Sequence, residues 1–469
     1  MMQNPDQILA VAQMQAAEAA LVDAGSSIDG LMQVAGRGAA QWVWRMSGGH
    51  EITVLCGPGN NGGDGYVIAE AIRERGGHVV VIAATDVKTE AAKNARAAFK
   101  GEVLDVHSGA DTRGEVLVDC LFGSGLSRPL SDDLHALLHK LSSQHRHNIA
   151  IDLPSGVESD SGVLLNAKAV QYDLTVCLGA WKFAHALMPA CASMGALRLV
   201  DIGIAALEGA AQSVTRPKIA PPAADLHKYT RGLLAVVGGS MPGAAMLACE
   251  AAQHAGAGYV KLFANSAPAN ASYDLVVDTG NLSDVLTDDR NTAILVGPGL
   301  GQGGAAIERL AIALADPVPA VLDADALVLI GTRQLAEREA PVIATPHEGE
   351  LATLEGMFEL GGSGSKVERV RQLAVASALV IVAKGPDTVI AAPDGQIACA
   401  SRAPSWLSTA GTGDVLAGLI ASRVAAGSHA FDAAAEGVWL HGEAARLCPP
   451  AFTAADLARA VPHAVAKCL

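Results

Sequence analysis

Short apolar, β-branched runs alternate with stretches of helical character along this chain, and the alternation occurs twice. The first series of runs falls at residues 52–56, 79–83, 116–119, 149–153 and 174–177. The second series falls at residues 233–237, 259–263, 293–296, 320–322, 342–344 and 380–383. Strands that are separated by helices are joined by crossovers and pair in parallel, so we predict an α/β fold with two parallel-rich sheets.

A proline-rich segment separates the two series of strands. Residues 216–222 contain three prolines, and because proline fixes φ and lacks an N–H donor, they predict an extended linker. The chain has 469 residues, which is enough for two or three domains. We predict a first domain at 1–213 with a Rossmann-like sandwich around its parallel sheet, a linker at 214–225 and a second domain at 226–469.

Composition and charge argue against several classes of protein. The net charge is −15 and no run of Lys or Arg occurs, so we expect no nucleic-acid partner. Gly, Pro or a charged residue interrupts every apolar stretch before the roughly 18 residues that a membrane-spanning helix needs, so we expect no membrane partner. The N-terminal residues lack signal-peptide features, and eight cysteines are scattered without a C-x-x-C pair. These features predict a cytoplasmic protein with reduced thiols.

A glycine-rich turn follows the first predicted strand. Residues 57–65 contain five glycines and lead directly into a helical pattern. Glycines let backbone N–H groups approach a phosphate, and the helix N-terminus adds a favourable partial charge. Gly57, Gly59 and Gly62 match the G-x-G-x-x-G pattern of dinucleotide-dependent dehydrogenases, with Asp86 near the end of the next strand. A tight strand-to-helix turn without a ligand is the alternative.

Two more polar loops follow strands of the first predicted sheet, at residues 119–129 and 152–156. Because the carboxyl ends of parallel strands meet at one edge of a sheet, these loops should form one crevice. Oxygens of Asn, Asp and Ser suit a hard cation, and the carboxylates can move protons. For any single one of these acids, a helix cap or a turn is the alternative. The residues that can converge are Asn60, Asn61, Asp64, Asp119, Asp152 and Ser155.

In the second half, Gly411-Thr-Gly-Asp414 precedes an apolar stripe at helical spacing. The glycines leave backbone N–H groups free to stabilise negative charge at the start of the helix, and Asp414 can accept a proton from a substrate hydroxyl. The alternative is that Asp414 only caps the helix. The chain has no Walker-type phosphate motif, so we place the diphosphate at Lys384 to Thr388, where a lysine adjoins a glycine turn. A solvated edge loop is the alternative there.

The first-half motifs resemble those of the NAD(P)H-hydrate epimerase domain, through residues 57–65, 119–129, 152–156 and 175–182. The resemblance implies that the R and S forms of hydrated NADH or NADPH are interconverted at C6. Asp119 and Asp152 are the nearest candidates for the acid and the base. Potassium binding is implied for Asn61, Asp119 and Ser155. The implied substrate contacts are Asn60, Asn61, Gly62, Gly63, Asp64, Gly123, Ser124, Gly125, Leu126, Ser127, Arg128, Pro129 and Asp152.

The second-half motifs resemble those of the NAD(P)H-hydrate dehydratase domain, a member of the ribokinase-like superfamily. The segments are 227–228, 238–240, 242–245, 297–301, 322–327, 345–350, 384–388 and 410–414. The resemblance implies that the S hydrate is dehydrated with ADP, giving AMP and phosphate, and that Mg²⁺ accompanies the nucleotide. The implied hydrate contacts are Ala244, Gly299, His347 and Asp414, and the implied nucleotide contacts are Lys384, Gly385, Pro386, Asp387, Thr388 and Gly413. The sequence departs from the family at Tyr229, where glycine is usual, and at Pro386-Asp387, where small residues are usual.

Together the two resemblances predict a bifunctional enzyme that repairs hydrated nicotinamide nucleotides and acts as a homo-oligomer. A small-molecule kinase fused to a dinucleotide-binding module is an alternative, which predicts a stable phosphorylated product. A non-enzymatic ligand sensor is a further alternative.

A histidine pair lies outside these motifs. His135 and His139 are four residues apart on a predicted helix, a spacing that can bind metal. The apolar stripe on that helix consists of Leu134, Leu137, Leu138 and Leu141. The stripe predicts instead that both histidines face solvent.

Overall fold

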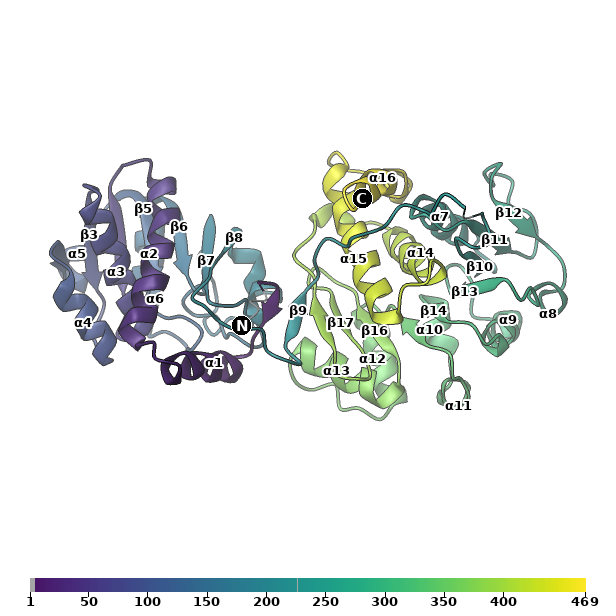
Figure 1. The fold of residues 1–469 in the computed structure, drawn as a ribbon, viewed down its shortest axis with the longest axis horizontal. Coiled ribbons are helices and arrows are strands. Elements are labelled where there is room, and N and C mark those ends of the chain that lie inside the picture. Colours follow the sequence, from purple (N-terminus) through teal and green to yellow (C-terminus); the bar gives the residue numbers. More distant parts are fainter. Residues whose placement is uncertain (1–4, 226) are drawn as a thin grey trace. The chain divides into compact units, whose positions relative to one another are not determined.

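The protein is described from a computed structural model that places residues 5–225 and 227–469. The chain divides into two compact units, the first ending at Gln212 and the second beginning at Ser213 (Figure 1). Residue 226, the predicted start of the second domain, lies outside the described residues. Each unit has its own predominantly parallel sheet, so the predicted α/β class is confirmed. In the described part of the chain, no helix is long and apolar enough to span a bilayer.

The sheet of the first unit has seven strands in the order β4-β3-β2-β5-β6-β7-β8, and every neighbouring pair is parallel. Its strands are β2 (Ile52–Cys56), β3 (Val79–Ala83), β4 (Glu102–Leu104), β5 (Gly114–Cys120), β6 (His145–Ile151), β7 (Leu174–Leu178) and β8 (Ala196–Val200). The strand order reverses at β2, because later strands are added on both of its sides. A crevice therefore opens at the carboxyl ends of β2 and β5, where two of the predicted polar loops begin.

Helices cover both faces of this sheet (Figure 1). They are α1 (Val11–Asp23), α2 (Ile28–Ser47), α3 (Asn60–Glu74), α4 (Glu90–Ala98), α5 (Val106–Gly109) and α6 (Asp132–Gln144). Successive strand residues point to opposite faces. Accordingly, Val54 and Val116 belong to a core with α2 and α3, whereas Leu55 and Leu117 belong to a second core with α6. Gln7–Ile8 (β1) also pairs with Ala211–Ser213 (β9) in antiparallel fashion.

The sheet of the second unit runs in the order β18-β17-β16-β15-β14-β13-β10-β11-β12. Its strands are β10 (Leu233–Val237), β11 (Tyr259–Phe263), β12 (Val276–Asp278), β13 (Asn291–Val296), β14 (Ala320–Leu322), β15 (Val342–Ala344), β16 (Val380–Ala383), β17 (Val389–Ala391) and β18 (Ile397–Cys399). The strands from β10 to β16 are parallel, and β17 and β18 follow β16 in antiparallel fashion.

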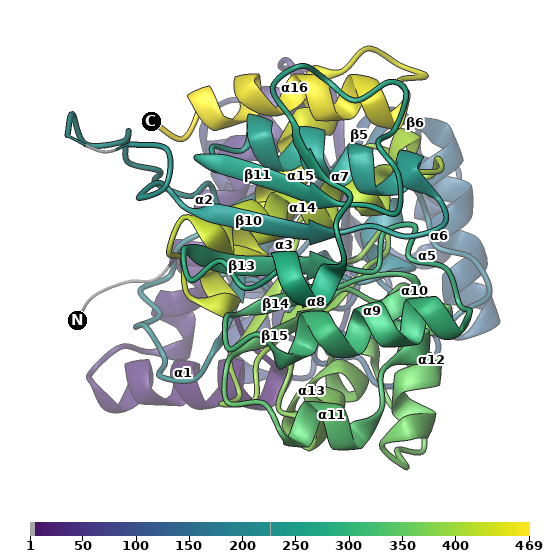
Figure 2. The same ribbon diagram turned by 90° about the vertical axis from the view of Figure 1, so that its right-hand side faces the viewer.

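Two groups of helices sandwich the second sheet, as Figure 2 shows. On one face lie α7 (Pro242–His254), α14 (Thr412–Ala425), α15 (Ala430–Leu447) and α16 (Ala454–Ala466). The remaining helices are α8 (Leu282–Val285), α9 (Gly304–Ala315), α10 (Asp325–Leu329), α11 (Thr332–Ala336), α12 (Glu348–Met357) and α13 (Lys366–Ser377). α14 is buried along most of its length against α7 and α15, which fixes the direction of its N-terminus.

The segment that follows the first unit makes specific contacts in the second. Val214 is buried in the core of the second unit, and its N–H donates to the carbonyl of Cys399 over 2.9 Å. The N–H of Ile219 donates to the carbonyl of Cys468 over 3.0 Å. Residues 214–219 therefore pack with the second unit.

His135 and His139 lie at the surface, as predicted, but are partly covered. Both are half-buried, and their Nε2 atoms are 3.1 Å apart. His135 Nε2 also lies 2.9 Å from the carbonyl oxygen of Lys168, so the loop before β7 covers this face of α6. The leucine stripe placed the buried face of α6 correctly but carried no information about the loop.

The glycines of the first turn are dictated largely by packing. A Cβ atom added at Gly57 would overlap with the carbonyl oxygen of Leu121, and one at Gly62 would overlap with that of Gly57. Gly63 and Gly65 contact side chains that leave no room for a Cβ atom. Only Gly59, of the five, has open space around its Cα atom.

We predict that Gly62→Ala lowers the free energy of unfolding of the first unit by about 1–3 kcal/mol, because backbone atoms must shift to admit the methyl group. Gly59→Ala is the matched control and should cost less than about 1 kcal/mol, since only the helix N-cap preference changes. Urea denaturation, monitored by hydrogen exchange in peptides from β2 and α3, measures the free energy of unfolding of both variants. Equal losses in the two variants would contradict this account.

Candidate active sites

In the first unit, Asp152 and Lys182 form a buried ion pair. Asp152 directly follows β6 with φ of 66°, and this conformation turns its side chain into the crevice. Lys182 Nζ lies 2.5 Å from Asp152 Oδ1 and 2.6 Å from the carbonyl oxygen of Leu178. The side chains are 1% and 10% exposed for Lys182 and Asp152. Asp152 Oδ2 accepts a hydrogen bond from the N–H of Ser124 over 2.9 Å, which ties the predicted substrate loop to the pair.

The charges of this pair are mutually dependent. Burial raises the pKa of Asp152, but the Lys182 ammonium outweighs it, so the pKa lies below its usual value. Burial lowers the pKa of Lys182, but Asp152 more than offsets this, so that pKa is raised. His185 accepts from the N–H of Lys182 at Nδ1 and therefore donates from Nε2 to the carbonyl of Asp152. Burial lowers the pKa of His185 to about 4, so this ring is neutral.

Asp119 is fully engaged by protein donors. Its Oδ1 accepts from the Leu121 N–H over 3.1 Å and from Ser155 Oγ over 2.7 Å. Its Oδ2 accepts from the Ser155 N–H over 3.0 Å and from the Tyr172 hydroxyl over 2.5 Å. Burial raises the pKa of Asp119, while the hydroxyls of Tyr172 and Ser155 oppose the rise. The carboxyl therefore anchors the loop after β6 to the end of β5.

Asn61 lies in the first turn of α3 and Asp64 follows that turn, and both are near Asp152. A Cβ atom at Gly123 would lie 2.8 Å from Asp152 Oδ2 and 3.4 Å from Asn61 Cγ. Gly123, Asp152 and Asn61 therefore lie close together. Both polar atoms of the Asn61 side chain are buried without a hydrogen-bond partner, which indicates a site that accepts a polar ligand. Burial, together with the charges of Asp152 and Glu18, raises the pKa of Asp64 well above its usual value.

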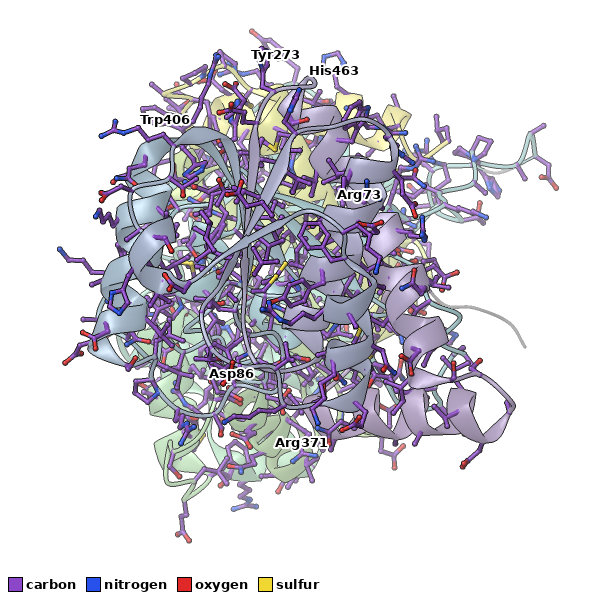
Figure 3. The ribbon with its side chains drawn as sticks, turned by 90° about the vertical axis from the view of Figure 1, so that its left-hand side faces the viewer. Arg73, Asp86, Tyr273, Arg371, Trp406 and His463 are labelled. Atoms are coloured by element: carbon purple, nitrogen blue, oxygen red, sulfur yellow. The ribbon has the colours of Figure 1, made fainter. Side chains whose placement is uncertain are left out.

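The other predicted contacts of the first unit spread over this crevice and its rim. Ser155 is buried in the loop after β6, and Gly62, Gly63 and Leu126 are buried as well. Ser124 is half-buried, and the exposed residues are Asn60, Gly125, Ser127, Arg128 and Pro129. Asp86, which would mark a dehydrogenase, is exposed beyond the end of β3 (Figure 3). Roles for Lys182, His185, Tyr172 and Glu18 were not predicted from the sequence, because these residues act on parts of the chain that are distant in sequence.

In the second unit, a lysine sits among carboxylates at the carboxyl ends of β14, β15 and β16. Lys384 Nζ lies 2.5 Å from Asp323 Oδ1 and 3.9 Å from Glu350 Oε2. Asp323 is buried, and its Oδ1 also accepts from the Thr345 hydroxyl over 2.6 Å. Asp325 accepts from the N–H of Gly301, which joins the loop after β13 to the same edge.

The N-terminus of α14 opens onto this cluster. Gly411 has φ of 91° and occupies the N-cap position, so Asp414 lies in the first turn and is not the cap. A Cβ atom at Gly413 would lie 3.5 Å from Lys384 Nζ, which places the helix start beside the lysine. Burial, followed by the charge of Asp323, raises the pKa of Asp414 to about 6. A carboxylate with that pKa can accept a proton near neutral pH.

The predicted hydrate contacts lie at several places along this edge. Ala244 lies in the first turn of α7, and Gly299 has φ of 65° and accepts a hydrogen bond from the N–H of Met241. A pocket of about 190 Å³ lies beside them and is lined by Gly238, Gly239, Ser240, Pro242, Ala245, Leu262, Ala264, Asn265 and Ser266. His347 is 63% exposed and caps α12, because its Nδ1 accepts from the N–H groups of Gly349 and Glu350.

The predicted nucleotide loop connects β16 to β17. Gly385 and Pro386 are exposed, Thr388 is half-buried and Asp387 is buried. The Thr388 hydroxyl donates to the carbonyl of Gly385 over 3.1 Å, which closes the turn.

Comparisons with known proteins agree with this division of the chain. Residues 234–466 match the NAD(P)H-hydrate dehydratase family, and residues 28–184 match the YjeF-related protein N-terminus family. The bifunctional NAD(P)H-hydrate repair enzyme Nnr of Salinibacter ruber is 32% identical over 98% of this chain and 96% of its own length. The chain belongs to the family of bifunctional NAD(P)H-hydrate repair enzymes.

Further relatives of this repair-enzyme family match to a similar extent. The Nnr protein of Thermofilum pendens is 33% identical over 88% of this chain and 86% of its own length. The solved ADP/ATP-dependent NAD(P)H-hydrate dehydratase of Bacillus subtilis, co-crystallised with ATP and Mg²⁺, is 29% identical. That similarity covers 54% of this chain and 95% of the dehydratase, with a TM-score of 0.48.

We predict that Lys182→Met lowers the free energy of unfolding of the first unit at pH 7 by about 3–5 kcal/mol, because it leaves Asp152 buried without a partner. The folded pKa of Asp152 is depressed, so the stability it contributes is present above its unfolded pKa and is lost as the pH falls. The deficit of the variant should therefore narrow below pH 4, which urea titrations at several pH values measure. Arg37→Gln, which breaks an exposed pair with Glu74, is the control and should cost less than about 1 kcal/mol. A deficit independent of pH would contradict the ion-pair account.

The pH dependence of stability expected from Asp414 is opposite to that expected from Asp152. Its folded pKa is raised, so ionisation costs the folded state stability as the pH rises above the unfolded pKa. We predict that Asp414→Asn raises the free energy of unfolding of the second unit by about 1–3 kcal/mol at pH 8. The gain should shrink toward pH 4, where the folded carboxyl is already neutral. Urea denaturation at both pH values tests this, and a variant that is no more stable at pH 8 would contradict it.

Proposed function

We propose that this protein repairs hydrated nicotinamide nucleotides with two separate sites. The first domain, predicted at 1–213, interconverts the R and S hydrates at C6. The second, predicted at 226–469 after the 214–225 segment, dehydrates the S hydrate with ADP, giving NAD(P)H, AMP and phosphate. The observation that carries the proposal is the raised pKa of Asp414 at the start of α14, beside Lys384. Membership of the repair-enzyme family supports both activities.

The proposed dehydration resembles a kinase reaction followed by elimination. Hydroxide is a poor leaving group, so the C6 hydroxyl is first phosphorylated. Asp414 takes the proton of this hydroxyl while the hydroxyl oxygen attacks the β-phosphorus of ADP, and AMP departs. The N–H groups at the start of α14 stabilise the charge on the transferred phosphoryl group. Phosphate then leaves C6 as the ring nitrogen donates its electron pair, and loss of a proton from C5 restores the dihydropyridine ring.

The charge at this site fits a nucleotide that arrives with Mg²⁺. Asp323, Glu350 and Asp414 surround a single lysine, so a bare diphosphate would be repelled. Among the described residues, no three side chains of His, Cys, Asp or Glu form a metal site. Mg²⁺ would therefore be held mainly by the phosphates and water and would neutralise developing charge. We propose that Lys384, Gly385, Pro386, Asp387, Thr388 and Gly413 contact the nucleotide, and that Ala244, Gly299, His347 and Asp414 contact the hydrate.

For epimerisation we propose Asp152 as the base and Asp64 as the acid. Their environments shift the two pKa values in opposite directions, which favours the ionised form of Asp152 and the protonated form of Asp64. Removal of the C6 hydroxyl proton and protonation of the ring nitrogen open the ring to an aldehyde, and closure on the opposite face inverts C6. Asp119, the other acid considered from the sequence, holds Ser155 and Tyr172 with both of its oxygens.

Potassium fits the donors of the first site only in part. The unpartnered oxygen of Asn61 is available to a cation. Both oxygens of Asp119 already accept two hydrogen bonds each, and Ser155 Oγ donates one of them. We propose Asn61 as the principal oxygen donor for potassium.

We also propose that the protein works in the cytoplasm on free NADH and NADPH hydrates, as a homo-oligomer. Among the described residues, the cysteines other than Cys191 are free, which fits a reducing compartment.

The decisive experiment supplies purified protein with S or R hydrate of NADH, ADP and Mg²⁺, and follows the absorbance of the reduced nicotinamide. The wild type should restore NADH from both epimers. Asp152→Asn should retain turnover of the S hydrate and lose turnover of added R hydrate, whereas Asp414→Asn should lose both by a factor of about 10³ or more. R-to-S conversion, followed by chromatography, should survive in Asp414→Asn. Failure of the wild type to restore NADH overturns the proposal, and a stable phosphorylated product would indicate a small-molecule kinase.

A further inference from the structure

Lys366, the first residue of α13, reaches into the loop that we propose as the nucleotide site. Its Nζ lies 2.7 Å from Asp387 Oδ1, 2.9 Å from the Asp387 carbonyl oxygen and 3.5 Å from the Lys384 carbonyl oxygen. One ammonium group therefore binds three oxygens of this short loop. The side chains of Lys366 and Asp387 are only 15% and 11% exposed, so water screens the contact weakly.

The contact resolves a conflict in the sequence of the loop. A carboxylate within a diphosphate-binding turn repels the ligand, and Asp387 lies within this turn. The ammonium of Lys366 neutralises that carboxylate, as a buried charge requires.

Gly385 makes room for the arrangement. A Cβ atom there would lie 2.9 Å from Lys366 Nζ and 3.0 Å from Asp387 Oδ1. Both distances are shorter than real Cβ contacts, so a side chain at residue 385 would press against the ion pair. The glycine of this turn thus admits the lysine as well as any ligand.

We propose that Lys366 is a positioning residue for nucleotide binding, acting through Asp387. It fixes residues 384–388 in the conformation that accepts the diphosphate and cancels the negative charge that Asp387 brings to the loop. Lys366 does not contact the hydrate in this scheme, so it controls the affinity for the nucleotide and not that for the hydrate. The inference rests on the proposed function of residues 384–388.

The test is a double-mutant cycle on the full-length protein, with the Kd of Mg²⁺–ADP measured by calorimetry. Lys366→Met should raise this Kd about 10-fold, because it removes the ammonium group that offsets the charge of Asp387 beside the ligand. Adding Asp387→Asn to that variant should bring the Kd back to within about threefold of wild type. The KM for the S hydrate should stay unchanged in both variants, whereas a general loss of structure would raise it.

Matched controls separate this from damage to the fold. Lys261→Met breaks a similarly covered ion pair with Asp278 at the other end of the sheet and should leave the Kd of ADP unchanged. If Lys366→Met fails to fold, two other variants test the proposal. Lys366→Arg keeps the positive charge and should bind ADP nearly as well as the wild type. Weaker binding of ADP by Asp387→Asn alone than by the wild type would count against the proposal.

A folded Lys366→Met variant with wild-type Kd, or a double variant as weak as the single one, overturns the inference about Lys366. A wild-type protein that binds no ADP overturns the proposed function instead. The two failures are therefore distinguishable.

Discussion

Both units of this protein depend on a buried carboxylate at the carboxyl end of a strand that is neutralised by one lysine. In the first unit Lys182 lies 2.5 Å from Asp152, and in the second Lys384 lies 2.5 Å from Asp323. Parallel sheets make this arrangement possible, because they bring several strand ends to one edge. Burial makes it costly to disturb, since removal of either partner leaves a charge without compensation. The same interaction therefore holds the loops in place and sets the electrostatic potential of each crevice.

The lysines also determine which carboxyls remain free for chemistry. Asp152 is paired with Lys182 and its pKa lies below the usual value, whereas burial raises the pKa of nearby Asp64. In the second unit, Asp323 takes the lysine, and its negative charge helps to raise the pKa of Asp414 to about 6. In each crevice, burial raises the pKa of one acidic residue, and the negative charge of a neighbouring carboxylate raises it further. Two unrelated sheets reach the same result through different loops.

The sequence predicted the central strands well, because strands buried on both faces read as uninterrupted apolar runs. It missed β4, β8 and β12, which lie at or near sheet edges and carry polar residues such as Glu102, Arg198 and Asp278. Of the six residues predicted to converge, Asn61, Asp64, Asp119, Asp152 and Ser155 lie at this crevice, whereas Asn60 is exposed at its rim. The sequence did not reveal that Asp119 has no oxygen to spare, nor that Lys182 pairs with Asp152, because both facts depend on partners at least 30 residues away. The glycines at 57 and 62 were interpreted as ligand-binding features, although the close approach of two backbone segments already requires them.

The connection between the units has a further consequence for how such a two-site protein can be divided. Val214 fills a place in the second core, and the Ile219 N–H binds the Cys468 carbonyl near the end of the chain. A fragment that began after the proline-rich stretch would lack the buried Val214 side chain. It would also leave the Cys468 carbonyl without the hydrogen bond from Ile219. Residues 214–219 thus pack in the second unit as well as connecting it to the first, and the second unit needs to retain them when it is produced alone.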